Sequence, residues 1–153
     1  MASVQPVINI SNKRATFNYF IDSSWEAGII LTGTEIKAIR EGKANLTDAY
    51  CFFKDEELWI KNMHISPYDK GSYANHPPRR DRKLLLNKRE LVKIRSKAKE
   101  KGVAVIPIRL YINDRSFAKV EIGIARGKKL YDKRETLKEN ESKREIDRVM
   151  KRF

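Results

Sequence analysis

The sequence predicts a mainly β fold, a small closed or nearly closed antiparallel β-barrel with two to three flanking helices. Its 153 residues are the length of one domain, and 41% of them are hydrophobic, which is enough to bury a core. Apolar residues alternate with polar ones in many short runs, as in strands that have one solvated face. Turn residues separate these runs, and no internal repeat indicates a second folded domain.

The chain is strongly basic, with a formal net charge of +13. Such an excess predicts attraction to polyanions, of which nucleic acid is the commonest in cells. No apolar run approaches the ~20 residues that span a bilayer, so we expect no membrane partner. The N-terminus lacks the layout of a signal peptide, and we expect a cytoplasmic protein. Cys51 is the single cysteine and stands among aromatic residues, which predicts a buried structural thiol.

The N-terminal third predicts two strands and a short helix. Residues 1–12 show no periodicity and are expected to be loose. A first strand is expected over 18–22, then a turn at 22–24 and a well-buried strand over 26–31, which is rich in β-branched residues.

A short helix is expected after Gly33. Thr34 can cap it, Glu35 suits the positive end of its dipole, and Gly42 can end it. Ile36 and Ile39 share its inner face, while Lys37 and Arg40 share its outer face. From these residues alone the helix plugs a barrel and presents a solvated basic face.

A hairpin is expected over 49–54 and 57–63, closed by Asp55 and Glu56. Its alternation is supplied by Tyr50, Phe52, Leu58 and Ile60. Trp59 lies on the face opposite Leu58 and Ile60, as core or as a half-buried lid. Residues 66–82 contain few aliphatic side chains, which predicts a long surface loop. It would present a dense positive patch to phosphates, formed by Arg79, Arg80, Arg82 and Lys83.

A second helix is expected from Asn87, its N-cap, to about Lys101, with Glu90 at the third position and Gly102 after its end. Its outer face is basic, and simple solvation of that face is an equal alternative to RNA contact. The basic residues are Arg89, Lys93, Arg95, Lys97, Lys99 and Lys101. A second long hairpin is expected over 103–112 and 117–125, with Pro107 at an edge or a bulge.

The composition changes at Gly127, where a polar, highly charged segment begins. We therefore divide the chain into a folded domain, 1–126, and a tail, 127–153. The tail ends in one helical stripe formed by Ile146, Val149, Met150 and Phe153. We expect it to be disordered in the free protein and to fold on binding. The alternative is an ordinary terminal helix docked on the barrel.

Motifs for catalysis are absent from the sequence. His64 and His76 have no cysteine cluster near them, so no zinc-ligand pattern exists. The chain also lacks the glycine-rich motifs that bind nucleotide phosphates. We therefore expect no metal, no cofactor and no enzymatic activity.

Several sequence blocks resemble one family. They are EAGIILTGTEIKAIREGKANLTDAY at 26–50, NKRA at 12–15, RKLLLN at 82–87, KVEIGIARGKK at 119–129 and DKR at 132–134. In this order and spacing, over nearly the whole chain, they resemble the SsrA-binding protein family, also called small protein B (SmpB). The resemblance implies a six-stranded Greek-key barrel, similar to oligonucleotide-binding (OB) folds, with flanking helices and a flexible basic tail. Phe17 and Asn18 depart from the pattern, because many family members have a histidine-containing pair there.

The resemblance also implies a function in trans-translation. A member binds the transfer-RNA-like domain of transfer-messenger RNA (tmRNA, or SsrA RNA) and brings it to ribosomes stalled on messages without a stop codon, which enables peptide tagging and ribosome rescue. We expect it to act as a monomer. Two alternatives are a generic basic RNA chaperone or ribosome-associated protein, and an RNA-modifying enzyme or nuclease, for which the residues offer little support.

By similarity, the RNA-contacting residues are Glu26, Leu85, Asn87 and Lys119, with Asn12, Lys13 and Arg40 as further candidates. Glu26 would accept from base N–H groups or orient a neighbouring lysine, and a structural salt bridge is the alternative. Leu85 could equally belong to the core, because Leu84 and Leu86 compete for the inside.

By the same resemblance, the tail engages the ribosome. Gly127, Lys128 and Lys129 form a hinge, and Asp132, Lys133 and Arg134 an adjacent ribosome-engaging triplet. The stripe that contains Val149 and Met150 becomes helical in the empty message channel of the small subunit, next to the decoding centre. Basic side chains suit a channel walled by phosphates.

Overall fold

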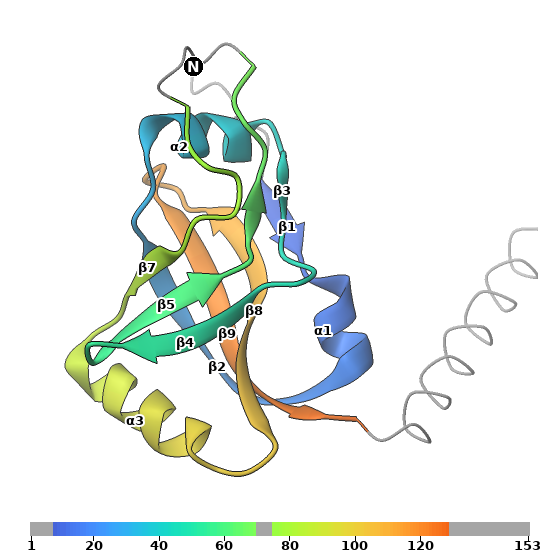
Figure 1. The fold of residues 1–153 in the computed structure, drawn as a ribbon, viewed down its shortest axis with the longest axis vertical. Coiled ribbons are helices and arrows are strands. Elements are labelled where there is room, and N and C mark those ends of the chain that lie inside the picture. Colours follow the sequence, from blue (N-terminus) through green and yellow to red (C-terminus); the bar gives the residue numbers. More distant parts are fainter. Residues whose placement is uncertain (1–7, 70–74, 129–153) are drawn as a thin grey trace, which may run out of the picture.

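The structure, a computed structural model, describes residues 8–69 and 75–128 (Figure 1). Its elements in chain order are β1 (Asn9–Ser11), α1 (Lys13–Asn18), β2 (Tyr19–Ile29), α2 (Gly33–Arg40), β3 (Ala44–Asn45), β4 (Tyr50–Lys54), β5 (Glu57–Lys61), β6 (His64–Ile65), β7 (Arg82–Leu85), α3 (Lys88–Ala98), β8 (Val103–Ile112) and β9 (Ala118–Gly127). The mainly β prediction is confirmed, and the described residues contain three helices. None of these helices is long and apolar enough to cross a membrane.

Six strands form a ring in the order β8, β4, β5, β7, β2, β9 and back to β8. All the pairings are antiparallel. β1 is added to β8 outside the ring, and β3 and β6 form a separate small sheet. Figure 1 shows α2 at one end of the ring and α3 at the other. The ring brings strands from every part of the described chain into contact, so one face can combine residues far apart in sequence.

Buried apolar side chains fill the inside of the ring. They include Ala27, Leu58, Ile60, Leu84, Val105, Leu110, Val120 and Ile122. α2 adds Ala38 and Ile39, and α3 adds Ile94. Burying one large aliphatic side chain stabilises a fold by about 1.5–3 kcal/mol. Because helices of this length are marginal alone, these contacts hold α2 and α3 in place.

The N-terminal segment is more ordered than expected. Residues 9–11 form β1, in which Asn9 pairs with Tyr111 and Ser11 with Arg109, so the expectation of a loose segment is wrong there. Residues 1–7 lie outside the described residues. α1 was also not expected, and its Ala15 is buried against Ile106. A three-residue strand is too short to show periodicity, so no pattern of residues predicts β1.

The expected turn at 22–24 is also wrong, because β2 is one continuous strand. Its register with β9 shifts between Ile21 and Ser23, which is a bulge. Asp22 stays exposed at the bulge and accepts a hydrogen bond from Arg126 Nε at 2.7 Å. The polar residues that predicted a turn are therefore accommodated without interrupting the strand.

The helix α2 begins two residues earlier than predicted. Thr32, not Thr34, is the N-cap, and it forms a capping box with Glu35. The Thr32 N–H donates to Glu35 Oε1 at 2.9 Å. Gly42 follows the helix with a φ of +74°, as a left-handed terminating position requires. Lys37 and Arg40 are exposed, as predicted.

The first hairpin is confirmed. Asp55 and Glu56 join β4 to β5 with positive φ angles of 52° and 64°, which match a two-residue turn. Cys51 faces inward opposite Ile60, and burial raises the pKa of its thiol far above the ordinary value. The predicted structural thiol is therefore buried. The register places Phe52 opposite Trp59, so Phe52 lies outward while Leu58 and Ile60 lie inward.

The segment 66–82 is not a simple surface loop. His76 is buried: its ring contacts Thr34 Oγ1 at 2.9 Å and the Ile65 carbonyl at 3.0 Å. Arg82 begins β7 and is completely buried. Residues 75–82 pack on α2 through polar contacts, so a scarcity of aliphatic residues did not keep them on the surface. Residues 70–74 lie outside the described residues.

The second helix and hairpin are largely as predicted. α3 ends at Ala98, three residues before the expected end. β8 and β9 pair around 113–117, and the register shift between Pro107 and Arg109 confirms a bulge beside the proline. β9 continues through Gly127, and the Lys128 N–H still donates to the Asn18 carbonyl at 2.8 Å. The predictions for residues 129–153 lie outside the described residues.

Candidate RNA-binding surface

The outer face of the ring is defined by alternation along its strands. Ala27 and Ile29 of β2 are buried, so Glu26 and Gly28 between them face outward. In β9, Val120 and Ile122 are buried, so Lys119 and Glu121 face outward. Residues paired across neighbouring strands share a face, so the registers show which outward residues lie side by side.

One row of outward residues crosses five strands. Asn9 of β1 pairs with Tyr111 of β8, Tyr111 with Lys119 of β9, Lys119 with Gly28 of β2, and Gly28 with Leu85 of β7. We call these five residues the outer row. The structure therefore brings together Lys119 and Leu85, two candidates that lie far apart in sequence.

Gly28 forms the floor of the outer row. A Cβ atom built at this position would lie 3.2 Å from Leu85 Cβ, closer than most such contacts. The absence of a side chain at Gly28 allows the Leu85 side chain to lie over the strand at this point. Leu85 itself is 50% exposed. The alternative that Leu85 belongs to the core is excluded, because Leu84 takes the inward position.

A second row lies beside the first. Arg109 pairs with Glu121, and Glu121 pairs with Glu26. Arg109 Nε donates to Glu121 Oε2 at 2.6 Å, and its guanidinium carbon lies 4.3 Å from the centre of the Tyr111 ring. The Tyr111 hydroxyl donates to the Glu26 carboxylate, which links the two rows. Glu26 therefore contacts a tyrosine and not a lysine within the described residues.

The remaining candidates are placed differently. Asn87 is exposed at the start of α3, where its Oδ1 accepts from the Glu90 N–H at 2.9 Å, so it is the predicted N-cap. Lys13 and Arg40 are exposed on α1 and α2. Asn12 is only 6% exposed, and its amide donates to the carbonyls of Leu46 and Pro107 at 3.2 and 2.9 Å. Asn12 therefore joins β1 to the ring.

The predicted positive patch at 79–83 is wrong for two of its four members. Arg82 is fully buried and both its Nε and the guanidinium of Arg80 donate to the Glu35 carboxylate. Burial alone would raise the pKa of Glu35, but the Arg80 hydrogen bond, the Thr32 N–H and the Arg82 charge together hold it below the ordinary value. Both arginines are paired with the single Glu35 carboxylate, and these contacts fasten residues 75–82 to α2. Arg79 stays exposed.

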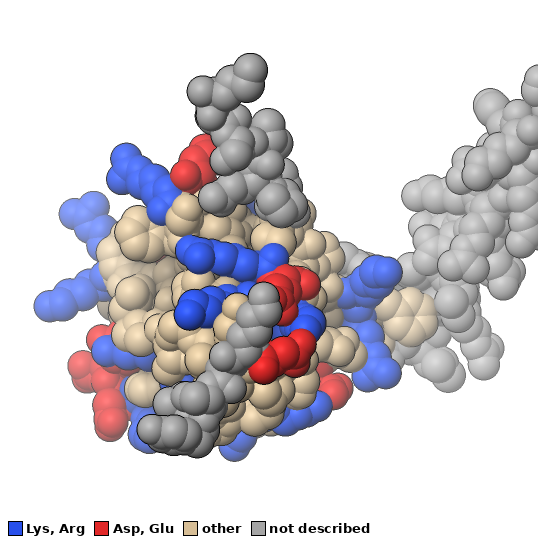
Figure 2. Space-filling model, turned by 90° about the horizontal axis from the view of Figure 1, so that it is seen from above, with Lys and Arg blue, Asp and Glu red and all other residues tan. Residues whose placement is uncertain are grey.

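The basic face of α3 is exposed as expected. Lys97 is anchored, with its Nζ 3.2 Å from Ser23 Oγ and 5.4 Å from the centre of the Trp25 ring. The other predicted cations, Arg89, Lys93, Arg95, Lys99 and Lys101, are exposed. Seen from the α2 end, basic side chains project on several sides of the molecule with acidic ones interspersed (Figure 2). On this face the basic side chains do not gather in one patch, so the outer row is identified from the strand registers and not from charge.

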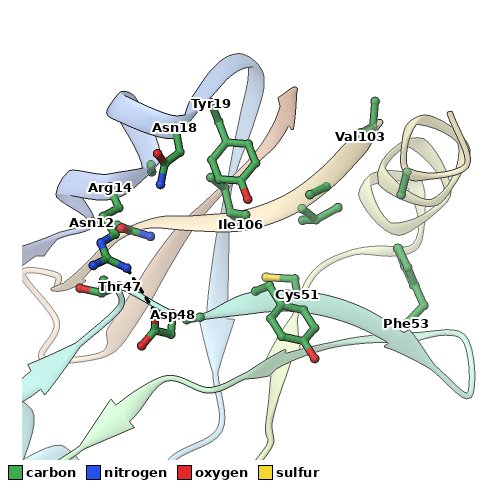
Figure 3. Close-up of a pocket in the computed structure, with 16 residues that line it drawn as sticks. Asn12, Arg14, Asn18, Tyr19, Thr47, Asp48, Cys51, Phe53, Val103 and Ile106 are labelled. Atoms are coloured by element: carbon green, nitrogen blue, oxygen red, sulfur yellow. Dashed lines mark ion pairs between the residues drawn. The ribbon is translucent and has the colours of Figure 1, made fainter. Parts of the chain in front are cut away.

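A pocket of about 550 Å³ lies where β4 and β8 diverge, beside α1. Figure 3 shows Tyr19, Cys51 and Ile106 around it, and the ion pair between Arg14 and Asp48, 3.6 Å apart, at one side. Within residues 8–69 and 75–128, no cluster of His, Cys, Asp and Glu could hold a metal ion. The protonated Cys51 thiol is a poor nucleophile.

Five members of the two rows were not predicted from the sequence: Asn9, Gly28, Arg109, Tyr111 and Glu121. The signal was present in the second hairpin: a turn at 113–117 pairs Tyr111 with Lys119. Counting back from that turn would have placed both on one face. The bond between Tyr111 and Glu26 spans 85 positions and leaves no pattern in the sequence.

Comparisons by sequence and by structure point to one family. The family whose sequence model matches is "SmpB protein", over residues 9–152. The SsrA-binding protein of Bacteroides thetaiotaomicron is 55% identical over 148 residues, covering 97% of this chain and 99% of that protein. The SsrA-binding protein of Bacillus cytotoxicus is 52% identical over 140 residues, covering 92% and 90%. A solved structure described as "tmRNA-SmpB: a journey to the center of the bacterial ribosome" matches with a TM-score of 0.69 and 49% identity, covering 82% of this chain and 86% of that chain.

Proposed function

Because this chain belongs to the SmpB family, whose named relatives are SsrA-binding proteins, we propose that it binds tmRNA and delivers it to stalled ribosomes. The activity is binding, in keeping with a family of RNA-binding proteins. In this function the protein recognises the transfer-RNA-like domain of tmRNA through its folded part and engages the ribosome through residues 127–153. It works in the cytoplasm, where both partners are found.

The outer row carries this proposal. It places a cation, Lys119, beside an aliphatic side chain, Leu85, and an aromatic one, Tyr111, on one face. Folded RNA is recognised through phosphates, riboses and unstacked bases, which require both positive charge and stacking or apolar surface. Cations distributed evenly over the surface would supply the positive charge but not the stacking or apolar surface. Asn87, two residues after Leu85, completes the RNA-contacting set, with Lys13 and Arg40 as peripheral cations. Glu26 lies beside the row, where it either accepts from base N–H groups or orients a neighbouring side chain.

We propose two finer points on the same basis. The ring of six strands, with its filled interior, is a closed Greek-key barrel of the OB type. Gly127 and Lys128 are still held by β2 and α1, so the proposed disorder in the free protein begins at residue 129. The residues from 129 on become helical in the message channel, with Gly127, Lys128 and Lys129 as the hinge. Asp132, Lys133 and Arg134 contact the ribosome next to it, and Val149 and Met150 form part of the helical stripe.

Binding to the isolated transfer-RNA-like domain, in excess bulk transfer RNA and across a salt series, tests the proposal. We expect binding that survives the competitor and weakens with salt, because phosphate contacts release counterions. Lys119→Ala should weaken it and reduce the slope of log K against log salt by about one. Lys61→Ala, an exposed lysine on β5, is the matched control. Wild-type binding that the competitor abolishes would instead indicate a generic basic RNA chaperone.

A further inference from the structure

Tyr111 occupies the outer row beside the best RNA-contacting candidate. It is the cross-strand partner of Lys119, and Asn9 lies on its other side. Its side chain is partly exposed, so one part of the ring packs on the protein and another part faces solvent. An aromatic ring next to a lysine on the same face is the combination that binds a ribose or an unstacked base together with its phosphate.

The ring of Tyr111 is fixed from two directions. Its hydroxyl donates to Glu26, and the guanidinium of Arg109 stacks on the ring at 4.3 Å from the centroid. Arg109 is itself held by Glu121, which accepts from its Nε. This hydrogen bond leaves the terminal nitrogens of Arg109 for a further acceptor, such as a phosphate oxygen. Burial and the Glu26 hydrogen bond raise the pKa of Tyr111 to about 12, so its hydroxyl remains a donor at neutral pH.

The position of Glu26 makes direct contact with RNA unfavourable. A carboxylate exposed on an RNA-binding face repels phosphates unless neighbouring groups compensate its charge. Here the Glu26 carboxylate is already occupied by the Tyr111 hydroxyl, with Arg109 in its own row and Lys119 in the outer row beside it. A rigidly held ring loses less conformational entropy on binding than a free one, so fixing Tyr111 increases the affinity of whatever contacts it.

We propose that Tyr111, with Arg109 stacked on it, contacts the transfer-RNA-like domain directly, and that Glu26 is a positioning residue that acts by holding Tyr111. This inference rests on the proposed function. Tyr111 contacts a ribose or an unstacked base, and Arg109 contacts the neighbouring phosphate. The role of Glu26 then lies in orienting a neighbour, and that neighbour is a tyrosine.

The contact is tested by binding of full-length variants to the transfer-RNA-like domain with bulk transfer RNA present. Tyr111→Ala should weaken binding by about tenfold or more, as expected for loss of one stacking contact. Tyr50→Ala is the matched control, because Tyr50 is an outward tyrosine on β4 that is 42% exposed. It should bind within about twofold of wild type. Circular dichroism and thermal unfolding of each variant verify that the fold is retained.

The role of Glu26 is tested by a double-mutant cycle that keeps the ring in place. Tyr111→Phe and Glu26→Ala should each weaken binding by about three- to tenfold. The double variant should have the same affinity as the single variant that binds more weakly, because both substitutions remove the same hydrogen bond. Multiplicative effects would mean that Glu26 contacts RNA independently and would overturn the proposal. Wild-type binding that resists the competitor, together with unchanged binding of Tyr111→Ala, would overturn this assignment and leave the proposed function standing. Loss of wild-type binding to the competitor would overturn both.

Discussion

Glu35 is a buried carboxylate that holds two arginines from a distant segment. Its two oxygens accept from Arg80 and Arg82, and its Oε1 also accepts from the Thr32 N–H that begins α2. Arg82 additionally donates to the Met63 carbonyl at 2.8 Å. Buried ion pairs contribute little net stability when complete, but removing one partner leaves an uncompensated charge. Glu35 therefore links α2, β7 and the segment between them.

Replacing Glu35 by Gln should lower the free energy of unfolding by about 3–5 kcal/mol near neutral pH, because the buried Arg82 charge loses its partner. The folded-state pKa of Glu35 lies below its ordinary value of 4.5, so its contribution is present above that value and is lost as pH falls through the folded pKa. The destabilisation caused by Glu35→Gln should therefore be smaller at low pH than at neutral pH. Urea unfolding from pH 7 to pH 3 measures both effects.

The exposed Glu56 in the β4–β5 turn supplies the control for this prediction. Glu56→Gln should change stability by less than about 0.5 kcal/mol at every pH. A Glu35→Gln protein as stable as the control variant would show that the Glu35 contacts do not hold Arg82 in the folded state.

At the scale of elements, α2 depends on the residues at its two ends. Its eight residues are too few for a stable isolated helix, so the capping box and the glycine after it define its length. Gly42 has a φ of +74° and an open environment, with no atom within 4 Å of a Cβ built there. Gly33, the first residue of the helix, is equally open, and its φ is not in the left-handed region. The two glycines therefore differ in backbone conformation and not in available space.

Substitutions of these two glycines by alanine should have opposite signs. Gly42→Ala should destabilise the protein by about 1 kcal/mol, because an alanine is strained in the left-handed region. Gly33→Ala should be neutral or stabilise it by up to about 1 kcal/mol, because it restricts the unfolded chain. Chemical denaturation of the two variants measures the difference. Equal effects at both positions would contradict the conformational explanation.

At the scale of the whole molecule, the ring and the residues beyond it are assigned separate tasks. The candidate RNA-contacting residues all lie within 8–128, and Lys128, the last described residue, donates its N–H to the Asn18 carbonyl at the end of α1. The proposed ribosome-engaging residues follow almost entirely after that point. The net charge of +13 serves both surfaces, since each faces a phosphate-rich partner.

A chain truncated after Lys128 should bind the transfer-RNA-like domain within about threefold of the full chain, because the outer row and its supports remain. The same chain should fail to support peptide tagging on stalled ribosomes in a reconstituted translation system. A full-length variant with alanine at Asp132, Lys133 and Arg134 provides a companion that keeps the chain length. Lost RNA binding in the truncated chain would refute this division of tasks.

Much of the fold could be predicted from local patterns. The first hairpin follows from Asp55 and Glu56 between alternating strands, and α3 follows from Asn87, Glu90 and Gly102 around an apolar stripe. β1, α1 and the continuous β2 could not be predicted, because they depend on pairing with β8 and β9. Short elements of this kind are stabilised by tertiary contacts and not by their own propensity.

By itself, the sequence determined the mainly β class, the excess of positive charge, the structural thiol and the motifs that resemble one family. Each of these depends on the composition of the chain or on residues that are close together in the sequence. Only the tertiary structure decided that Arg82 lies inside with Glu35, 47 positions away, and that Tyr111 bonds to Glu26, 85 positions away. The physical reason is that burying a charged side chain costs desolvation free energy, which only a nearby partner can offset. The pairing of distant strands in the ring determines which partners come together.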